Sequence, residues 1–232
     1  MTDSPDGEPF DAFASEYGRL LDDPLRRRFA GDSEYFIHQK CRALLRELEA
    51  RLGSGPWRVL DVGCGQGTAL SFLADHCDVI GTDVSTGMLQ QRPPHARVVV
   101  QEPFDLPFVS GSFDAAFAFC VYHHIEAANH VRHLRELSRV VRPGGLVLVF
   151  EHNPLNPITR RVFTRAPIDR GCEMIPRQRL TQVFRDAQLE ELRHRYVLFL
   201  PQFLFPFLGF SEPHLGRIPL GGQYYVAGRT RF

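Results

Sequence analysis

The sequence predicts an α/β fold built on a doubly wound parallel sheet, and three observations support this. Short apolar stretches alternate with amphipathic stretches through the middle of the chain. The apolar stretches are apolar along their whole length, which indicates strands that are buried on both faces. A glycine-rich turn, Gly63–Gly67, follows the first of these stretches and leads into a helical one. A parallel sheet with helices on both faces accounts for all three features.

Two helices are predicted before the sheet begins. From Pro9 to Leu21 the apolar residues recur at three- and four-residue steps, a pattern typical of an amphipathic helix. The second helix is expected to begin at Asp32 or Ser33, either of which can cap it, and to end at Gly53.

Strands and helices then alternate along the chain. The predicted strands are Trp57–Val62, Cys77–Thr82, Ala96–Gln101, Phe113–Val121 and Leu146–Glu151. The predicted helices between them are Thr68–His76, Ser85–Gln91 and about Glu126–Val141. The sequence RPGG ends the last helix and precedes the last of these strands.

The part of the chain after Glu151 has a less regular pattern. Residues 152–175 are rich in proline and arginine and predict a long loop, followed by a helix near Pro176–Ala187 and a strand at Leu192–Leu200. Gln223–Phe232 predicts a final strand. Four arginines of the loop are candidates for binding an anionic part of a substrate, with a solvated basic face as the alternative: Arg160, Arg161, Arg165 and Arg170.

Composition argues for one cytoplasmic domain without nucleic-acid or membrane-spanning function. The 232 residues carry 27 basic and 27 acidic side chains, so no net charge attracts a polyanion. Five cysteines without a C-x-x-C pair fit a reducing compartment. The acidic amino terminus does not resemble a signal peptide, and no stretch reaches membrane-spanning length. Peripheral lipid contact through the apolar segment Tyr196–Phe210 stays open.

The glycine-rich turn indicates a nucleotide-like ligand. Glycine has no Cβ, so the backbone of Gly63, Gly65 and Gly67 can approach a ligand closely. Asp83 ends the next strand, where an exposed carboxylate can accept hydrogen bonds from both ribose hydroxyls. The nicotinamide pattern G-x-G-x-x-G would place its last glycine at Thr68, so a dehydrogenase is the second choice.

Four motifs occur in order between Tyr35 and Glu151: VLDVGCGQG, GTDVSTGML, EPFDLPFVSGSFDAAFAFCVYHHI and LRELSRVVRPGGLVLVFE. With them the chain resembles the class I S-adenosylmethionine-dependent methyltransferases, especially the branch similar to the ubiquinone and menaquinone biosynthesis methyltransferases. The resemblance implies a Rossmann-like, seven-stranded mixed sheet whose last strand is antiparallel. It also implies amino-terminal lid helices (1–53), a cofactor-binding core (54–151) and substrate-side and carboxyl-terminal sheet elements (152–232).

The cofactor that the resemblance implies is S-adenosyl-L-methionine, with S-adenosyl-L-homocysteine as its product. The glycines would line the methionine end, Asp61 would organise the ammonium group, Asp83 would hold the ribose and Met88 would cover the adenine. The alternatives are a helix cap for Asp61 and an ordinary core position for Met88. Glu102 and Pro103 stand where the family often has an acidic and then a small residue, so the carboxylate is longer and an amide donor is missing; solvated surface is the alternative for Glu102. The expected cofactor-binding residues are Asp61, Gly63, Cys64, Gly65, Gly67, Asp83, Val84, Met88, Glu102, Pro103 and Cys120.

The resemblance further implies transfer of a methyl group to a small molecule. The sulfonium is already activated, so alignment and exclusion of water suffice and no metal is required. If the acceptor must lose a proton, histidine is the best-suited base, and His123, His124 and His152 follow strands at the ligand-binding edge. Their alternative role is support of the loops.

Aromatic residues in 10–17 and 196–210 predict an acceptor with an apolar or ring portion, such as a quinone, polyketide, other natural product or lipid-linked molecule. Closure of the sheet end is the alternative role for these side chains. A protein that binds the cofactor without turnover is the alternative function. The methylated atom, the acceptor and the oligomeric state are not predicted by the sequence.

Overall fold

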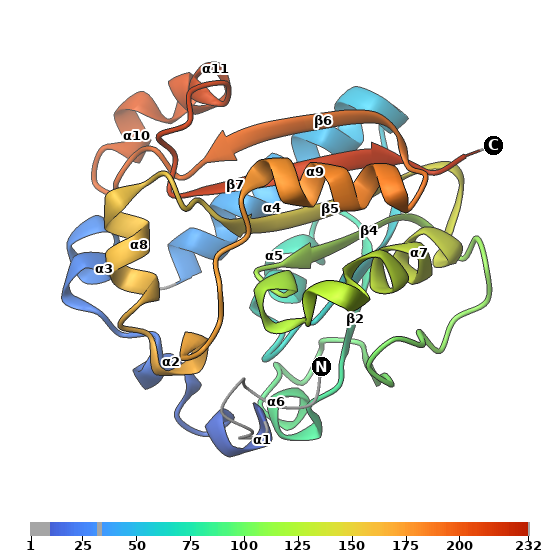
Figure 1. Cartoon of the computed structure of the whole chain (residues 1–232), viewed down its shortest axis with the longest axis horizontal. Coiled ribbons are helices and arrows are strands. Elements are labelled where there is room, and N and C mark those ends of the chain that lie inside the picture. The colour runs from blue at the N-terminus through green and yellow to red at the C-terminus, as the bar shows by residue number, and fades with distance from the viewer. Residues whose placement is uncertain (1–9, 32–33, 232) are drawn as a thin grey trace.

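The chain folds around one seven-stranded sheet with strand order β3-β2-β1-β4-β5-β7-β6 (Figure 1). The computed structural model describes residues 10–31 and 34–231. The strands are β1 (Arg58–Val62), β2 (Asp78–Asp83), β3 (Val98–Val100), β4 (Phe113–Phe119), β5 (Val141–His152), β6 (Glu190–Val197) and β7 (Gln223–Arg229). All pairs among β1 to β5 are parallel, and β7 runs antiparallel between β5 and β6. The predicted mixed sheet with an antiparallel last strand is therefore confirmed.

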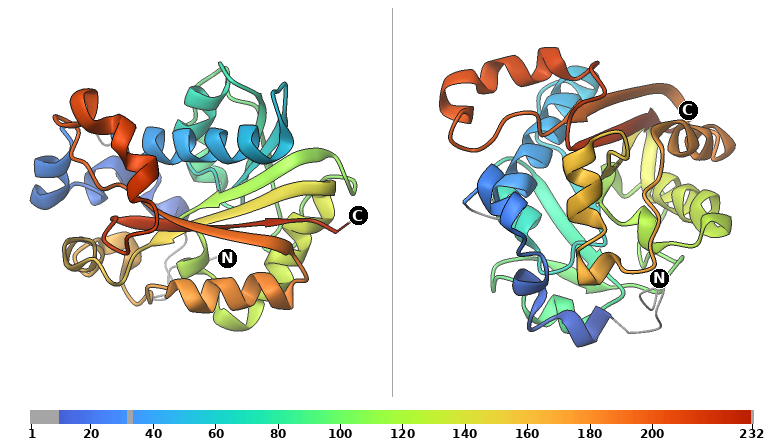
Figure 2. Two further views of the ribbon diagram at one scale, coloured as in Figure 1. Left: turned by 90° about the horizontal axis from the view of Figure 1, so that it is seen from above. Right: turned by 60° about the vertical axis from the view of Figure 1, so that its left-hand side comes forward.

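Helices cover both faces of this sheet (Figure 2, left). Apolar side chains of α4 (Glu34–Leu52), α5 (Thr68–Leu73) and α6 (Thr86–Gln90) belong to one core cluster. Those of α7 (His130–Val140) and α9 (Arg177–Asp186) belong to the cluster on the other side. Because the strands contribute to both clusters, they are apolar throughout, and the doubly wound arrangement is confirmed.

The amino-terminal region differs from the prediction of one helix at Pro9–Leu21. It forms three short helices: α1 (Phe10–Phe13), α2 (Tyr17–Leu20) and α3 (Pro24–Phe29). The break between α1 and α2 has a tertiary cause, because the Gln66 side-chain amide donates to the Ala14 carbonyl (2.7 Å), the acceptor that a continuous helix would use. Pro9 and the expected caps of α4, Asp32 and Ser33, lie outside the described residues. Gly53 ends α4 with a positive φ, as predicted.

The predicted loop 152–175 is wrong in part, because it contains α8 (Pro157–Phe163) and the 3-10 turn η3 (Pro167–Asp169). Asn156 caps α8 by accepting hydrogen bonds from the backbone N–H groups of Ile158 and Thr159, and Pro157 occupies the first helical position. This Asn-Pro pair was a helix signal within a segment whose proline and arginine content suggested a loop.

Several other helices and strands begin or end at residues different from those predicted. The predicted helix 126–141 comprises the 3-10 turn η2 (Ala127–Asn129) and α7. The RPGG sequence lies inside β5. β6 ends at Val197 because Leu198 has a φ of 64°. The aromatic segment after it contains α10 (Phe205–Leu208) and the 3-10 turn η4 (Gly209–Ser211), with α11 (Glu212–Leu215) following. No helix in the described ranges is both long enough and apolar enough to cross a bilayer.

Candidate functional site

The glycine turn lies at the carboxyl ends of β1 and β2 and is held tightly. The N–H groups of Gly63 and Cys64 both donate to the Thr82 carbonyl, at 2.8 and 3.0 Å. Gly63, Gly65 and Gly67 have φ angles of 76°, 52° and 75°, which side chains rarely tolerate. A Cβ on Gly63 would lie 2.6 Å from Val121 Cγ2. The turn thus depends on glycine both for its backbone conformation and for its packing against the segment that follows β4.

Asp83 braces this turn from the end of β2. Its carboxylate accepts hydrogen bonds from the N–H groups of Gly65 (2.8 Å) and Ser85 (2.9 Å). The expectation that this carboxylate is exposed is wrong, since the residue is only 8% exposed. Burial raises its pKa, although these hydrogen bonds act in the opposite direction. Asp83 therefore organises the turn, and its predicted contact with a ribose would add to that role.

Asp61, in β1, carries a buried carboxylate oxygen that lacks a partner. The residue is 2% exposed, and its Oδ1 has no hydrogen-bond partner among the described residues. Burial and the nearby Asp83 raise the pKa of this carboxyl to about 8, against the opposing charge of Lys40. A buried carboxylate without a partner is costly. The arrangement suits a bound ligand that brings a cationic donor, and the alternative role of Asp61 as a helix cap finds no hydrogen bond to support it.

Lys40 is the only lysine of the sequence, and the sequence predictions missed it. It projects from α4, is 3% exposed, and places Nζ 3.7 Å from Cys120 Sγ and 4.8 Å from the centre of the Phe119 ring. No carboxylate of the described residues lies within ion-pair distance of it. Its being the single lysine of an arginine-rich sequence was the feature that could have indicated a special role for it. Its buried ammonium can receive an anionic group of a ligand.

The other predicted cofactor residues fall into two groups. Met88 is buried against Gly65, where a Cβ would meet its Cε at 3.3 Å, and the half-buried Val84 lies beside Asp83. The Cys64 side chain instead packs into the core toward Gly81.

The Glu102 side chain is exposed and Pro103 is half-buried, and their contact with the adenine stays a prediction. The buried polar residue after β3 is Gln101, whose Oε1 has no partner among the described residues. Sequence reasoning did not name it, because the family pattern points to the residue that follows it.

The three predicted histidines do come together. His123, in the 3-10 turn η1 (Tyr122–His124), places Nδ1 2.8 Å from Glu151 Oε2 and Nε2 3.3 Å from Asp169 Oδ1. Burial disfavours the charged ring, but the two carboxylates outweigh burial and raise the pKa of His123 to about 10. Asp169 was missed, because it comes from η3 within the predicted loop and only the fold brings it here.

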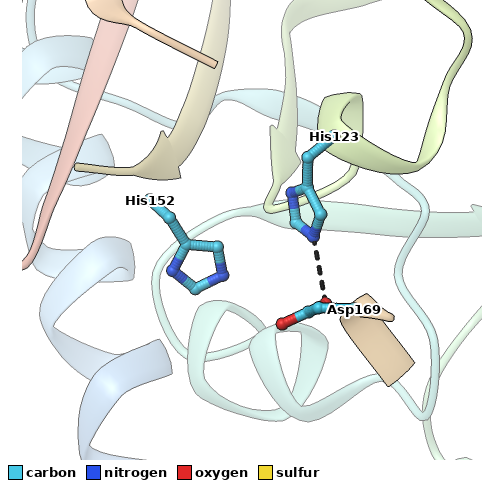
Figure 3. Close-up of side chains that lie close together, drawn as sticks. All are labelled: His123, His152 and Asp169. Carbon is cyan, nitrogen blue, oxygen red and sulfur yellow. Dashed lines mark hydrogen bonds and ion pairs between the residues drawn. The ribbon is translucent and has the colours of Figure 1, made fainter. Parts of the chain in front are cut away.

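His152 and His124 lie on either side of His123. The ring centre of His152 is 5.2 Å from that of His123, and Figure 3 shows both rings directed toward Asp169. His124 places Nδ1 3.2 Å from Cys172 Sγ. Burial and the charge of His123 lower the pKa of His152 to about 4 and that of His124 to about 3. Both rings are therefore neutral at pH 7.

The three histidines and Asp169 line a cavity of about 390 Å³. Its polar end is formed by the three histidines and Asp169, and its edge by Lys40 and Cys120, which has a φ of 57°. The other walls are mostly apolar and come from α2, α3, α4, α8 and the segments beside them; they include Leu20, Phe29, Phe36, Ile37, Val162 and Ile168.

The predicted contribution of aromatic residues from 196–210 to this cavity is wrong. From that segment only Leu198 lines it, whereas Phe203, Phe207 and Phe210 are 67%, 76% and 76% exposed. Of residues 10–17, Tyr17 lines it. Among the four arginines of the predicted loop, Arg165 lines the cavity and forms an ion pair with Asp23 (3.7 Å).

The amino-terminal helices contact both the glycine turn and the cavity, and their role as a lid stays a prediction. The Asp11 carboxylate accepts hydrogen bonds from the Gly87 N–H (2.8 Å) and from the Ser85 hydroxyl, which attaches α1 to α6. The two helices lie side by side in Figure 1. The ring of Phe10 contacts that of His124 with 5.0 Å between centres. One segment thus reaches from the glycine turn to the histidines.

Comparison with known proteins identifies the kind of domain. A family model described as a methyltransferase domain matches residues 60–149. A demethylmenaquinone methyltransferase of Beutenbergia cavernae is 41% identical over 114 residues, 47% of this chain and 45% of that protein. A 27-O-demethylrifamycin SV methyltransferase of Amycolatopsis mediterranei is 30% identical over 152 residues, 60% of this chain and 55% of that protein. The matches thus span about half the length of these curated relatives.

The fold has a close counterpart among solved structures. A SAM-dependent methyltransferase of Thermotoga maritima, described as a possible histamine N-methyltransferase, superposes with a TM-score of 0.68 at 18% identity, over 96% of this chain and 98% of that one. The resemblance to class I methyltransferases that the four motifs predicted is confirmed.

Proposed function

We propose that the chain is an S-adenosylmethionine-dependent methyltransferase acting on a small molecule with an apolar or ring portion. The observation that carries the proposal is the placement of Asp61 and Lys40 near each other without an ion pair: a buried carboxylate oxygen lacks a partner among the described residues, and the only lysine lies close enough to influence its pKa. The methionine end of the cofactor has an ammonium and a carboxylate group, and these two side chains complement both. A nicotinamide cofactor has no ammonium group, which disfavours a dehydrogenase.

The other candidate residues around the glycine turn fit the same cofactor. The turn Gly63–Gly67 admits a ligand to its backbone, Asp83 stands at the end of β2 for the ribose, and Met88 lies behind the turn. Gln101 offers a buried amide oxygen that has no partner in the described part of the chain. When bound, the cofactor supplies a methyl group on an activated sulfonium.

The chain's own contribution is to bind, orient and shield the acceptor. The apolar walls of the cavity exclude water and fit a ring system, since about 390 Å³ is within the usual range of small-molecule sites. The histidines and Asp169 at its polar end orient the nucleophilic atom, which gains the methyl group and releases its proton. Both ring nitrogens of His123 are engaged by carboxylates, so His123 holds Asp169 in position. The proton-transfer role predicted for His124 or His152 stays a prediction.

The relatives support the class of acceptor. Two of them are named for demethylmenaquinone and for 27-O-demethylrifamycin SV. Ring-containing molecules of these kinds fit the largely apolar lining of the cavity better than a small charged acceptor does. We therefore propose a quinone, a polyketide or a similar ring-containing natural product as the acceptor.

Calorimetry with S-adenosylhomocysteine tests the cofactor site. The wild-type protein should bind it, and Asp83→Ala should weaken binding by about 1.5–3 kcal/mol, as for a lost hydrogen bond to a charged group. Lys40→Met should weaken binding by a similar amount, while the exposed Asp75→Ala serves as the control. A folded wild-type protein that binds neither S-adenosylmethionine nor its product would refute the proposal.

A radiolabelled methyl-transfer assay tests the acceptor class. Quinols and phenolic polyketides should be methylated in preference to small charged amines, protein or tRNA. Val162→Phe, which fills the cavity, should reduce kcat/KM for the acceptor by about tenfold or more while S-adenosylhomocysteine affinity is unchanged. Preference for a highly charged acceptor would contradict the proposed class.

A further inference from the structure

We infer that His123, His152 and Asp169 form a binding site for a divalent transition-metal ion at the polar end of the cavity. The metal site itself is inferred from three side chains and their neighbours, independently of the proposed function. Only the role of the ion in methyl transfer rests on the proposed function. Each residue offers one ligand atom, and the three atoms lie within 4.8 Å of one another. All three residues line the cavity. Figure 3 shows the three side chains directed toward one point.

The separations suit coordination. Two ligands bound to one ion at about 2.1 Å each stand roughly 3.0–3.4 Å apart in octahedral or tetrahedral geometry. His123 Nε2 and Asp169 Oδ1 are already 3.3 Å apart. The ligand atoms of the set now lie up to 4.8 Å apart, so His152 would have to approach this pair by up to roughly 1.4 Å to complete the coordination. Two imidazoles and one carboxylate are a ligand set typical of zinc and of divalent iron, cobalt and related ions.

The surroundings of His123 are those of a metal-binding histidine. Glu151 is fully buried in β5 and accepts hydrogen bonds from the Tyr122 N–H (2.8 Å) and from His123 Nδ1 (2.8 Å). Without an ion the ring is charged and Nε2 also carries a proton, which an ion would displace; the proton held on Nδ1 would stay, and carboxylates in this position are a regular feature of metal sites. Glu151 thus fixes both the orientation and the tautomer of the ring.

An independent observation lies beside His152. Gln223, at the start of β7, is 7% exposed and its Oε1 has no partner among the described residues. Its Nε2 lies 3.5 Å from His152 Nδ1. When the amide is rotated by 180°, the oxygen takes this place and accepts a hydrogen bond from Nδ1–H, which frees the other ring nitrogen of His152 for an ion. The buried amide oxygen then gains the partner that it lacks, while Nε2 gives up the hydrogen bond that it now donates to Cys120 Sγ (3.3 Å).

Charge favours the same conclusion. Glu151 and Asp169 bring two buried carboxylates to His123, and buried carboxylates require positive charge nearby. Without an ion the charged His123 ring balances one of them, and a divalent ion that displaces the Nε2 proton would balance both. Phe163 packs against His123 and His152, with ring centres 5.4 and 5.3 Å apart, and limits the positions of both rings.

Three protein ligands leave coordination positions open toward the cavity. An acceptor hydroxyl bound there would lose its proton to water more readily, because the ion lowers the hydroxyl's pKa. Its oxygen would then form the new O–C bond as the methyl–sulfur bond breaks. The inference therefore narrows the acceptor to one that offers an oxygen ligand, such as a ring hydroxyl.

Titration of metal-free protein with Co²⁺, followed by its visible absorption and by competition with Zn²⁺, tests the site. Wild-type protein treated with EDTA should bind one Co²⁺ with a spectrum of nitrogen and oxygen ligation. His152→Ala and Asp169→Asn should each weaken binding at least tenfold, and Glu151→Gln should weaken it by about 10- to 100-fold, as for other supporting carboxylates. His95→Ala, which removes an exposed histidine outside the site, should bind as the wild type does.

S-adenosylhomocysteine binding measured on the same samples separates this inference from the proposed function. A wild-type protein that binds S-adenosylhomocysteine but no Co²⁺ in a saturable one-to-one manner would overturn the metal site alone. The metal site is also refuted if His152→Ala and Asp169→Asn, shown to be folded by circular dichroism, bind Co²⁺ with unchanged affinity. A protein that binds Co²⁺ but neither form of the cofactor would leave the metal site standing and refute the methyltransferase.

Discussion

Individual residues at the carboxyl edge of the parallel strands carry costs that a ligand can relieve. Asp61 and Gln101 each bury a side-chain oxygen without a partner among the described residues, and Gln223 does the same at the start of β7. Cys120 adopts a φ of 57°, which is uncommon for a residue with a side chain. Costs of this kind persist where the surrounding structure imposes them, and they gather at functional sites. The same features also occur elsewhere in the described residues, so only the positions of these four residues beside the candidate site connect them with a ligand.

Asp61 should make cofactor binding depend on pH. Burial and Asp83 raise its pKa to about 8, so at pH 7 the carboxyl of the empty protein is mostly protonated despite the opposing charge of Lys40. A bound ammonium favours the ionised form, so binding should release a proton. Affinity for S-adenosylhomocysteine should then rise by up to ~10-fold per pH unit between roughly pH 6 and 7.5 and level off above the pKa.

Calorimetry in two buffers of different protonation enthalpy measures this release directly. Asp61→Asn should bind more weakly and release no proton. The stability of the empty protein should depend on pH in the opposite direction. Because the pKa of Asp61 is raised in the folded protein, its protonated carboxyl stabilises the fold at low pH, and this contribution to the free energy of unfolding is lost as pH rises through about 8. Equal pH slopes for wild type and Asp61→Asn would exclude Asp61 as the source.

Gly63 should tolerate no side chain. Alanine there would meet a φ of 76° and place its Cβ 2.6 Å from Val121 Cγ2. We expect Gly63→Ala to lower the free energy of unfolding by about 2–4 kcal/mol, from the left-handed backbone and the overlap together. We expect the double variant Gly63→Ala, Val121→Ala to lose less free energy of unfolding in urea than the sum of the losses of the two single variants. The reason is that Val121→Ala removes the steric overlap but leaves the backbone strain at residue 63.

Gly18→Ala is the matched control, because a Cβ there meets nothing within 4 Å in helix α2. It should be neutral or stabilising by up to about 1 kcal/mol. If Gly63→Ala unfolds at the same urea concentration as wild type, the steric account of the turn is wrong.

Among the elements, the short amino-terminal helices are the ones that connect the two halves of the site. α1 is attached to α6 through Asp11, and the turn after α1 is attached to the glycine turn through Gln66. α2 and α3 then line the cavity together with α8, which α3 contacts. Short helices have little stability of their own, so these tertiary contacts determine whether they stay closed.

Asp11→Ala should loosen this lid without unfolding the core. It removes the acceptor of the Gly87 N–H and Ser85 hydroxyl, while the core helices keep their contacts. We expect S-adenosylhomocysteine to dissociate about 3- to 10-fold faster in stopped-flow measurements, with faster hydrogen exchange in 10–21. Glu16→Ala, which removes only an exposed pair with Arg19, is the control. Unchanged dissociation in Asp11→Ala would show that α1 does not retain the cofactor.

The parallel strands and the glycine turn could be predicted because their cause is local. A strand covered on both faces must be apolar along its length, and a turn with positive φ requires glycine, so both are visible in the sequence. The break at Ala14 could not be predicted, because it depends on a hydrogen bond from Gln66.

Asp169 was missed for the same reason. It reaches His123 only after α8 and η3 fold back over the end of β5, so no spacing in the sequence links the two residues. The cavity walls were misassigned because Tyr196–Phe210 was judged by its aromatic content, whereas the positive φ of Leu198 directs the chain away from the cavity.

In the whole molecule, the sheet divides two core clusters while the ligand sites lie together at one edge of it. The predicted cofactor residues come from β1, β2, α6 and the segments that follow strands β1 to β4, and the cavity adds α2, α3, α8 and the loops beside them. Strand β6, at the far edge, and α9, on one face, supply core without lining the cavity. Ligand binding should therefore stabilise the fold unevenly.

Saturating S-adenosylhomocysteine should raise the midpoint of thermal unfolding and protect one side of the molecule. A ligand at 100 times its Kd adds about 2.7 kcal/mol to the free energy of unfolding, which for a domain of this size corresponds to roughly 5–10 °C. Hydrogen exchange should slow most in α1, the glycine turn and α6, where local opening exposes the cleft, and least in β6. Asp11→Ala should show a smaller rise in the midpoint, because its lid contributes less to the bound state. If exchange slows equally in β6 and in the glycine turn, the cofactor suppresses only the global unfolding of the domain. In that case the amino-terminal helices do not open independently of the rest of the fold.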